Sequence, residues 1–280
     1  MMKNKKPLSA RKKFNQLFGV EKPIIGMVHV QALPGTPRHH YPMDKIIEVA
    51  VQEAVVLVKY GVHAVMLENM HDVPYLNRIV GPEIIAAMTA VASAVRKAVK
   101  VPLGIQILAG ANQAALAVAL AADFQFIRAE GFVFGHVADE GYMDSDAGEL
   151  LRYRKMIGAE HIAVFTDIKK KHSAHAITTD VTLAETAQAA EFFLSDGLII
   201  TGTATGSPTD PEDLKAVRKA TDLPVLVGSG VTPENFQSVA HYADGFIIGS
   251  YFKKDGYWKN GVDGGRVKLL YRAWMEMGGR

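Results

Sequence analysis

The sequence contains no cysteine, which excludes disulfides, thiolate nucleophiles and thiolate metal sites. Long hydrophobic runs are also missing. The apolar stretches fall well short of the roughly 18 residues that cross a bilayer, so we expect no transmembrane helix. The start of the chain lacks the apolar stretch of a secretory signal. These absences favour a reducing compartment, with the cytoplasm as the expected localisation, and leave organelle targeting or peripheral membrane association open.

Eight short apolar runs alternate with longer segments of helical period, which is typical of parallel βαβ units. The clearest helical segment is 43–60, and Asp210-Pro211 and Thr232-Pro233 mark two further helix starts. Eight such repeats without a second compositional region predict an α/β fold, a (β/α)8 TIM barrel, rather than an open doubly wound sheet. The expected strands are 23–30, 63–69, 102–108, 126–131, 161–168, 197–202, 224–230 and 245–250.

Acidic residues are absent from the first 20 positions, which carry six Lys or Arg side chains. Subtracting these six positive charges from the formal net charge of +2 leaves −4 for the remainder. A mildly acidic body argues against nucleic acid as a partner, because such binding needs clustered Lys and Arg. We interpret residues 1–17 as a basic leader that runs into a short helix closing the bottom of a single barrel domain, residues 18–280. The alternatives are a weak membrane-surface contact through residues 3–18 and an organelle-targeting segment.

Polar residues close most of the apolar runs, and in this fold the active site forms at the C-terminal ends of the strands. Titratable groups in such a setting suit general acid/base chemistry, because partial burial and neighbouring charges shift their pKa values. The alternative for each of them is a structural hydrogen bond or ion pair. The candidates are His29, Glu68, Asn69, Gln106, Arg128, Glu130, Asp167, Thr201, Ser229 and Ser250.

Glycine-rich turns follow the last two expected strands and predict a phosphate site. Glycine lets backbone N–H groups approach an anion closely, and a helix expected to begin near Thr232 would add its positive end. The run 201–206 after the sixth strand offers further hydroxyl and N–H donors, or is an ordinary flexible loop. We therefore expect a phosphorylated small molecule as the ligand. Its phosphate would be held by Gly202, Thr203, Gly228, Ser229, Gly230, Gly249 and Ser250.

Signals for a metal are weaker. His39-His40 and the pair His172 and His175 lack the spacing of a metal site. The acidic segment after the fourth strand is compatible with a hard divalent cation, although solvated loop acids are the commoner case. We assign no metal ligand and expect no cofactor, while leaving room for a divalent metal. The acidic segment contains His136, Asp139, Glu140, Asp144 and Asp146.

Short motifs along nearly the whole chain match one known family in a fixed order. They are Ile25-Gly26-Met27-Val28-His29 with Leu33-Pro34-Gly35 and Pro37, Glu68-Asn69 with Asp72, Pro74 and Tyr75, Phe126-Ile127-Arg128, Asp167 with Lys171-His172, Thr201-Gly202 with Ala204-Thr205-Gly206, Gly228-Ser229-Gly230-Val231, and Ile248-Gly249-Ser250 with Phe252-Lys253. From about residue 18 to its end the chain thus resembles the BtpA/SgcQ family. It departs from the family pattern after the third strand, where Gln106 and Ala109-Gly110-Ala111-Asn112 replace an asparagine followed by Arg-Asn-Asp.

The resemblance implies a barrel of the ribulose-phosphate-binding type. One class of members is linked to photosystem I accumulation as a peripheral thylakoid membrane protein, and another is encoded beside sugar-phosphate genes. These associations imply two different kinds of function for a member of the family.

Our leading hypothesis is an enzyme, an isomerase, epimerase or lyase that acts on a phosphorylated sugar or phosphoribosyl compound by proton transfer next to a carbonyl. The alternative is a non-catalytic, peripheral-membrane assembly factor of the photosystem I type that uses the barrel as a scaffold. We also expect a homo-oligomer. The expected catalytic residues are Asp167 and Glu68 as acid and base, with His29 and Arg128 as further candidates. Lys171 and His172 lie on a loop that we expect to close over the substrate and stabilise developing negative charge.

Overall fold

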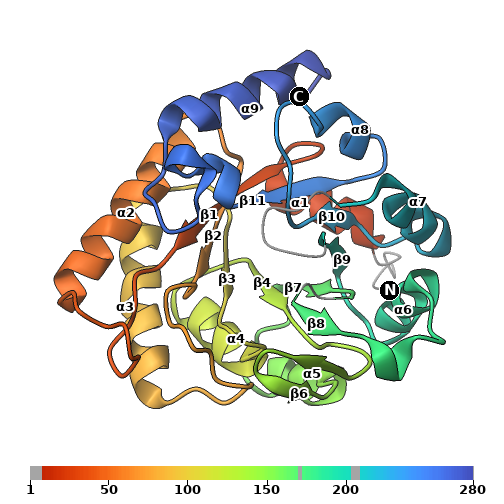
Figure 1. Ribbon diagram of the computed structural model, residues 1–280, viewed down its shortest axis with the longest axis horizontal. Coiled ribbons are helices and arrows are strands. Elements are labelled where there is room, and N and C mark those ends of the chain that lie inside the picture. Colours follow the sequence, from red (N-terminus) through yellow and green to blue (C-terminus); the bar gives the residue numbers. More distant parts are fainter. Residues whose placement is uncertain (1–7, 170–171, 203–208, 280) are drawn as a thin grey trace, which may run out of the picture.

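The computed structural model describes residues 8–169, 172–202 and 209–279. Eight parallel strands form a closed barrel in the order β1-β11-β10-β9-β7-β4-β3-β2, and helices surround it (Figure 1). Each strand lies inside one of the eight predicted runs, so the TIM-barrel prediction is confirmed. The strands are β1 (Ile24–His29), β2 (Ala64–Glu68), β3 (Leu103–Gln106), β4 (Phe126–Ala129), β7 (Ala163–Asp167), β9 (Gly197–Ile200), β10 (Val225–Val227) and β11 (Gly245–Ile248).

Helices lie outside the strands because the connecting segments carry apolar residues at helical spacing that pack on the barrel. The segment predicted at 43–60 forms α2 (Met43–Lys59), with Ala50 and Ala54 on its buried face. Asp210 caps α7 (Pro211–Ala220) as predicted, since its carboxylate accepts a hydrogen bond from the amide two residues on. Within the described ranges, none of the helices has both the length and the hydropathy of a membrane span. The other helices around the barrel are α3 (Pro82–Ala98), α4 (Asn112–Ala121), α5 (Ala147–Met156), α6 (Leu183–Phe192), α8 (Phe236–Ala240) and α9 (Gly264–Glu276).

A short helix, α1 (Ala10–Phe18), closes the bottom of the barrel. Phe14 and Phe18 join the apolar interior, with ring centroids 5.7 Å apart between Phe14 and Phe165 and 5.6 Å apart between Phe18 and Phe126. Residues 10–17, which the sequence analysis assigns to the leader, are therefore all helical, and this helix packs on the barrel. A ligand has to enter from the opposite end.

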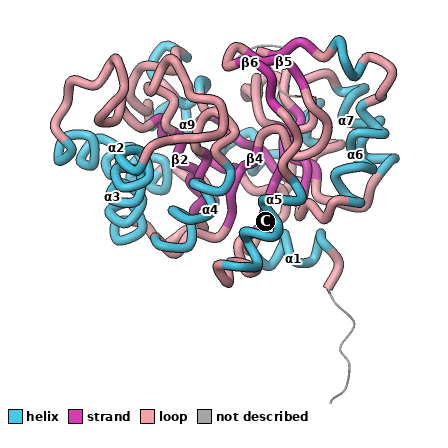
Figure 2. Tube along the Cα trace, turned by 90° about the horizontal axis from the view of Figure 1, so that it is seen from below, coloured by secondary structure: helices cyan, strands magenta, loops and turns pink. Residues whose placement is uncertain are grey.

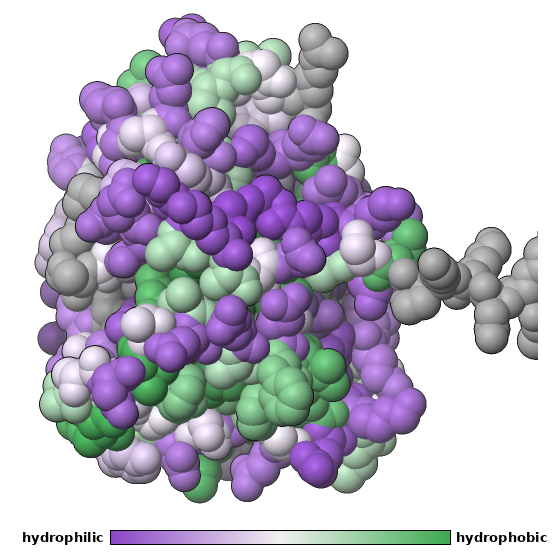
Figure 3. Space-filling view, turned by 90° about the vertical axis from the view of Figure 1, so that its right-hand side faces the viewer, coloured by the Kyte–Doolittle hydropathy of each residue, from purple (hydrophilic) through white to green (hydrophobic). Residues whose placement is uncertain are grey.

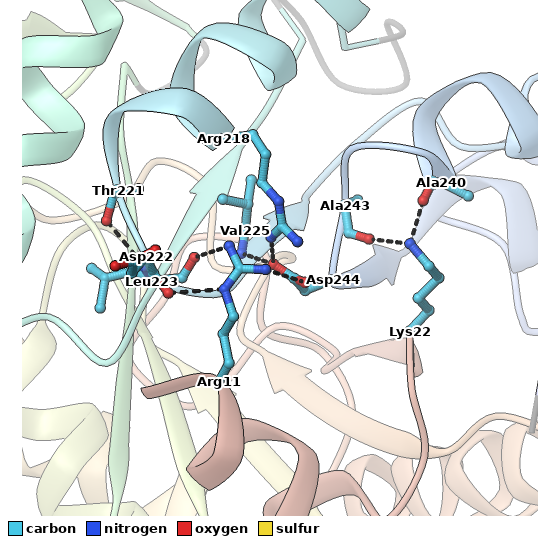
Figure 4. A network of polar contacts seen from close by, with 10 residues as sticks. All are labelled: Arg11, Lys22, Arg218, Thr221, Asp222, Leu223, Val225, Ala240, Ala243 and Asp244. Carbon is cyan, nitrogen blue, oxygen red and sulfur yellow. Dashed lines mark hydrogen bonds and ion pairs between the residues drawn. The ribbon is translucent and has the colours of Figure 1, made fainter. Parts of the chain in front are cut away.

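Polar contacts hold α1 and the chain before β1 against the last two barrel repeats (Figure 4). The Nε of Arg11 donates to the carbonyl of Asp222 at 3.0 Å, and its guanidinium pairs with Asp244 at 3.3 Å. Asp244 also pairs with Arg218 of α7. Lys22 donates to two backbone carbonyls, one in α8 and one just after it. These contacts anchor the first helix at several points.

A three-stranded antiparallel sheet stands at the other end of the barrel, and the sequence analysis does not predict it. It consists of β5 (His136–Ala138), β6 (Gly141–Met143) and β8 (Ser173–Ala174), in the order β6-β5-β8. Figure 2 shows β5 and β6 at the end away from α1. Strands this short carry no periodic signal, and β8 comes from a later loop. The segment interpreted as a loop of solvated acids is thus in large part a β-hairpin.

His63, just before β2, joins the barrel to the last helix. Its Nδ1 accepts a hydrogen bond from the amide of Ile24 at 3.0 Å, and its ring centroid lies 4.4 Å from that of Trp274 in α9. Burial lowers the pKa of His63 from 6.5 to about 4. The folded protein therefore keeps this ring neutral, with the Nδ1 lone pair engaged by the backbone.

We predict that protonation of His63 contributes to acid unfolding. Its pKa is lower in the folded than in the unfolded state, so its stabilising contribution is present above pH 6.5 and is lost as the pH falls toward 4. We expect the free energy of unfolding to fall by about 1 to 2 kcal/mol. The full pKa difference would correspond to about 3 kcal/mol, but the ring is partly exposed and solvent screening reduces the effect. Urea unfolding across this pH range checks this against His63→Gln, which keeps an acceptor and does not titrate. Equal losses of unfolding free energy in both proteins would contradict it.

Candidate functional site

The C-terminal ends of five strands surround a cavity of about 200 Å³ at the open end of the barrel. The strands are β1, β2, β4, β10 and β11. Parallel strands of a closed barrel all end at one rim, which is why residues far apart in the sequence meet here. Eight of the predicted site residues line the cavity: His29, Glu68, Arg128, Gly228, Ser229, Gly230, Gly249 and Ser250.

The other predicted site residues have different positions. Asp167 is buried against Arg128, and Gly202 lies beside Ser229. His172 is exposed in the loop after β7 and does not line the cavity. The last two, Lys171 and Thr203, lie outside the described residues.

Arg128 and Asp167 form a bidentate ion pair beneath the cavity. The Nε and NH2 of Arg128 each donate to one carboxylate oxygen of Asp167, both at 2.7 Å. The two side chains are only 6% and 1% exposed. Burial alone would lower the pKa of Arg128, but the Asp167 carboxylate more than offsets this and raises it above its ordinary value. The guanidinium of Arg128 therefore stays protonated at the cavity, where Asp167 holds it in place and compensates its charge.

His29 and Glu68 stand side by side because β1 and β2 pair in a register that sets these residues opposite each other. The Nε2 of His29 lies 3.9 Å from a carboxylate oxygen of Glu68. Its Nδ1 lies 2.9 Å from the backbone carbonyl of Trp258. A carbonyl only accepts, so Nδ1 carries a proton and donates it in this contact, and in the neutral form of the ring Nε2 is the acceptor. This pair can accept and pass on a proton.

The loops after β10 and β11 contain glycines at positions where a side chain would crowd its neighbours. A Cβ at Gly249 would lie 3.0 Å from the Nε2 of His29, and one at Gly228 would lie 2.6 Å from a methyl of Ile199. Gly230 has φ +68°, which side chains rarely allow. The backbone of both loops can thus approach a ligand next to His29.

The loops after β9 and β10 are joined by Ser229, whose Oγ accepts a hydrogen bond from the amide of Gly202 at 2.8 Å. This amide is therefore engaged within the protein. Two other residues at strand ends, Gln106 at the end of β3 and Thr201 just after β9, each have a buried side-chain oxygen without a hydrogen-bond partner among the described residues. Buried polar atoms of this kind are usually satisfied by water or a ligand.

The prediction that a helix begins near Thr232 is wrong. Residues 233–235 form a turn, and α8 begins only at Phe236. The side chain of Asn235 explains the difference: its Oδ1 accepts from the amide of Thr232 at 2.9 Å, and its Nδ2 donates to the carbonyl of Gly230 at 2.7 Å. These two bonds stabilise a loop instead of a first helical turn.

Sequence reasoning missed Arg266, which lines the cavity from the first turn of α9. Tyr251 and Met70 were missed as well. The segment before Arg266 carried a signal, because Asp263 caps α9 by accepting from the amides of Gly265 and Arg266. A capped helix after the last barrel strand would have brought its first basic residue into consideration.

Several other candidates have structural partners. The amide of Asn69 donates to Asp72 and its oxygen accepts from a backbone amide, each within 2.8 Å. Asp146 of the acidic segment pairs with Arg78 at 2.7 Å and accepts from Asn112 at 2.9 Å. Among the residues that the structure describes, no group of three or more His, Asp or Glu side chains could hold a metal ion.

A buried ion pair anchors the loop between β11 and α9, which carries Ser250 and two short 3₁₀ turns (Ser250–Phe252 and Lys254–Gly256). Lys253 is fully buried, and its Nζ lies 2.7 Å from a carboxylate oxygen of Glu53 in α2. The other oxygen of Glu53 accepts from the amide of Val262 at 3.2 Å. Burial lowers the pKa of Lys253, and the Glu53 carboxylate opposes this. The pair thus fixes one side of the cavity to α2.

We predict that Lys253→Met destabilises the fold by about 3 to 5 kcal/mol, because it leaves the Glu53 carboxylate buried without its cation. The double variant Lys253→Met with Glu53→Gln should recover most of this loss, since it removes both charges and keeps an acceptor for Val262. Urea unfolding of the two variants checks this. A single variant within 1 kcal/mol of the original protein, or a double variant no better than the single, would contradict it.

Three similarities to other proteins bear on this site. The chain is 49% identical to an uncharacterized mitochondrial protein of Caenorhabditis elegans over 92% of its own length and 95% of the relative's. It is 34% identical to the photosystem I biogenesis protein BtpA of Synechocystis over 93% and 91% of the two chains. The phosphoribosyl anthranilate isomerase of Thermus thermophilus has the same fold, with a TM-score of 0.56 at 13% identity over 91% and 99% of the chains.

The sequence model of the BtpA family matches residues 20–276, and this range includes every described residue of the cavity. The match also begins close to residue 18, where the sequence motifs placed the start of the resemblance. On this evidence the chain belongs to the BtpA family.

Proposed function

We propose that this barrel is an enzyme that moves a proton next to a carbonyl in a phosphorylated sugar or phosphoribosyl compound. The proposal rests on one observation: His29, Glu68 and Gly249 line the same cavity. Gly249 is so close to His29 that a Cβ on the glycine would lie 3.0 Å from the ring. A phosphate on the glycine-rich loops would therefore lie beside an acid/base pair. The T. thermophilus phosphoribosyl anthranilate isomerase, by its name an isomerase of a phosphoribosyl compound, shares the fold.

In the proposed reaction the carboxylate of Glu68 takes a proton from the carbon next to the carbonyl. Negative charge then develops on the carbonyl oxygen, and the guanidinium of Arg128 stabilises it. The Nε2 of His29, an acceptor in the neutral ring, takes the proton of the neighbouring hydroxyl and returns it to the oxygen that has become anionic. Glu68 then gives its proton to the carbon that carried the hydroxyl, which completes an isomerisation and restores both groups. An epimerase or a lyase would share only the first step, the removal of the proton by Glu68.

Asp167 has a positioning role in this scheme. Both of its oxygens accept from Arg128, and its side chain is 1% exposed, so proton transfer falls to Glu68. Gly230, Gly249 and Ser250 offer the donors for phosphate, while Ser229 orients the loop. The predicted closing of Lys171 and His172 over the substrate stays part of the proposal.

The first test is a thermal-shift screen against sugar phosphates, nucleotides and inorganic phosphate, because a ligand of the folded state raises the melting temperature. Each ligand that binds is then incubated with the protein in D2O, and exchange of its carbon-bound protons is followed by NMR. We predict exchange next to the carbonyl, slowed on the order of 10²- to 10⁴-fold in Glu68→Gln.

The matched control is Glu48→Gln, which changes an exposed carboxylate on α2 that contacts its helix neighbours Lys45 and Gln52. It should leave the exchange rate unchanged. Glu68→Gln should retain the thermal shift, since the phosphate loops are intact. Unchanged exchange in Glu68→Gln would remove this residue's role, and the absence of any shift with a phosphate would overturn the proposed function.

A non-catalytic assembly role is the second candidate, favoured by the name of the Synechocystis relative, a photosystem I biogenesis protein. An assembly factor needs a surface for its partner. The side of the molecule that carries α6 and α7 is mostly hydrophilic, with apolar areas between the polar ones (Figure 3). Phe192 and Leu194, in and just after α6, are 82% and 71% exposed. The predicted homo-oligomer and the cytoplasmic localisation stay predictions.

Removing residues 1–7 separates the two functions, because it takes away three lysines and leaves α1 on the barrel. If the protein is an enzyme, we predict that phosphate binding is unchanged and that neither form sediments with vesicles of anionic phospholipid. Sedimentation of the full chain, lost on truncation, would support the membrane-associated role instead.

A further inference from the structure

We propose that Arg266 is the cation that recognises the phosphate of the substrate, so that the site selects a phosphomonoester dianion. This inference rests on the proposed function and adds a charged residue to a phosphate site that otherwise consists of glycine and serine donors. Arg266 lines the same cavity as Gly230, Gly249 and Ser250. It projects from the first turn of α9, beyond the last barrel strand.

The guanidinium of Arg266 is held in a fixed position. Its Nε donates to the backbone carbonyl of Tyr251, and its central carbon lies 4.4 Å from the centroid of the Tyr251 ring. Stacking on an aromatic ring and one hydrogen bond restrict the long side chain before any ligand arrives. The loss of side-chain entropy on binding is then small.

Within the described part of the protein, the guanidinium of Arg266 has no carboxylate at ion-pair distance. None of the ion pairs among the described residues includes it, in contrast to Arg128, which is paired with Asp167. Two acids on neighbouring segments have other hydrogen-bond partners: Asp263 caps α9, and the side chain of Glu234 bonds Thr232. The bond with Thr232 is the main cause of the lowered pKa of Glu234, and the charge of Arg266 adds a smaller contribution. Two nitrogens of Arg266, NH1 and NH2, can therefore bind two phosphate oxygens at once.

The two arginines of the cavity thus differ in what they can bind. Arg128 is neutralised by Asp167 and suits an oxygen on which charge only develops during the reaction. Arg266 has no such counterion and suits a group that arrives with its charge. A phosphomonoester, with about −1.5 to −2 charges at neutral pH, satisfies Arg266 and the backbone donors of both loops together.

The test measures binding of glycerol 3-phosphate, a simple phosphomonoester, by isothermal calorimetry. We predict that Arg266→Gln weakens binding about ten- to hundredfold, the usual effect of losing charge-assisted hydrogen bonds. Arg266→Lys should recover only part of the affinity, because lysine lacks the planar fork. The matched control is Arg272→Gln, which removes an exposed guanidinium from the same helix and should change nothing.

A second readout is the pH dependence of the binding affinity, which reports on charge and not on loop structure. Affinity of the original protein should rise as the phosphate passes its second pKa of about 6, and Arg266→Gln should lose most of this rise. Equal affinity or an equal pH profile in Arg266→Gln, with binding by the original protein intact, overturns the role of Arg266 and leaves the proposed function standing. No binding by the original protein overturns both.

Discussion

Eight parallel strands that close on themselves must all end at one rim, and this constraint brings together the strand-end groups of the cavity. The pairing of β1 with β2 sets His29 opposite Glu68. A shift of one residue would turn either side chain outward to the helices, because successive residues of a strand face opposite sides. With α1 closing the other end by Phe14 and Phe18, the rim is where a ligand can meet these residues. The chemistry of the protein thus depends on strand register.

The charges beneath this rim have an energetic cost. Arg128 and Asp167 are nearly fully buried, and a buried ion pair often adds little net stability compared with apolar residues of similar volume. What this ion pair contributes is a guanidinium held in a fixed position at the cavity. Arg266, at the wall of the same cavity, has no carboxylate within ion-pair distance among the described residues. The site therefore combines one compensated and one uncompensated cation with the carboxylate of Glu68.

Loops outside the barrel are tied down by contacts to other elements. Lys253 pairs with Glu53 of α2, and Asn235 closes the loop after β10 onto Gly230. Such anchors allow glycine-rich segments to keep a defined shape, although glycine itself favours disorder. A site that is ordered before the ligand binds spends less of the binding energy on ordering.

The sequence by itself determined the eight strands, the capped start of α7 and most of the rim, because these depend on local periodicity and on the polarity of single positions. His29, Glu68, Arg128 and Gly249 were found in this way. Only the tertiary structure decided which of them touch, since ion-pair partners and hydrogen bonds across loops leave no periodic trace. The engagement of Asp167 by Arg128, the turn made by Asn235 and the three-stranded sheet that includes β8 all join segments that come together only when the barrel closes. Arg266 belongs to the same group: its type was visible in the sequence, but its place in the cavity required the fold of the last loop.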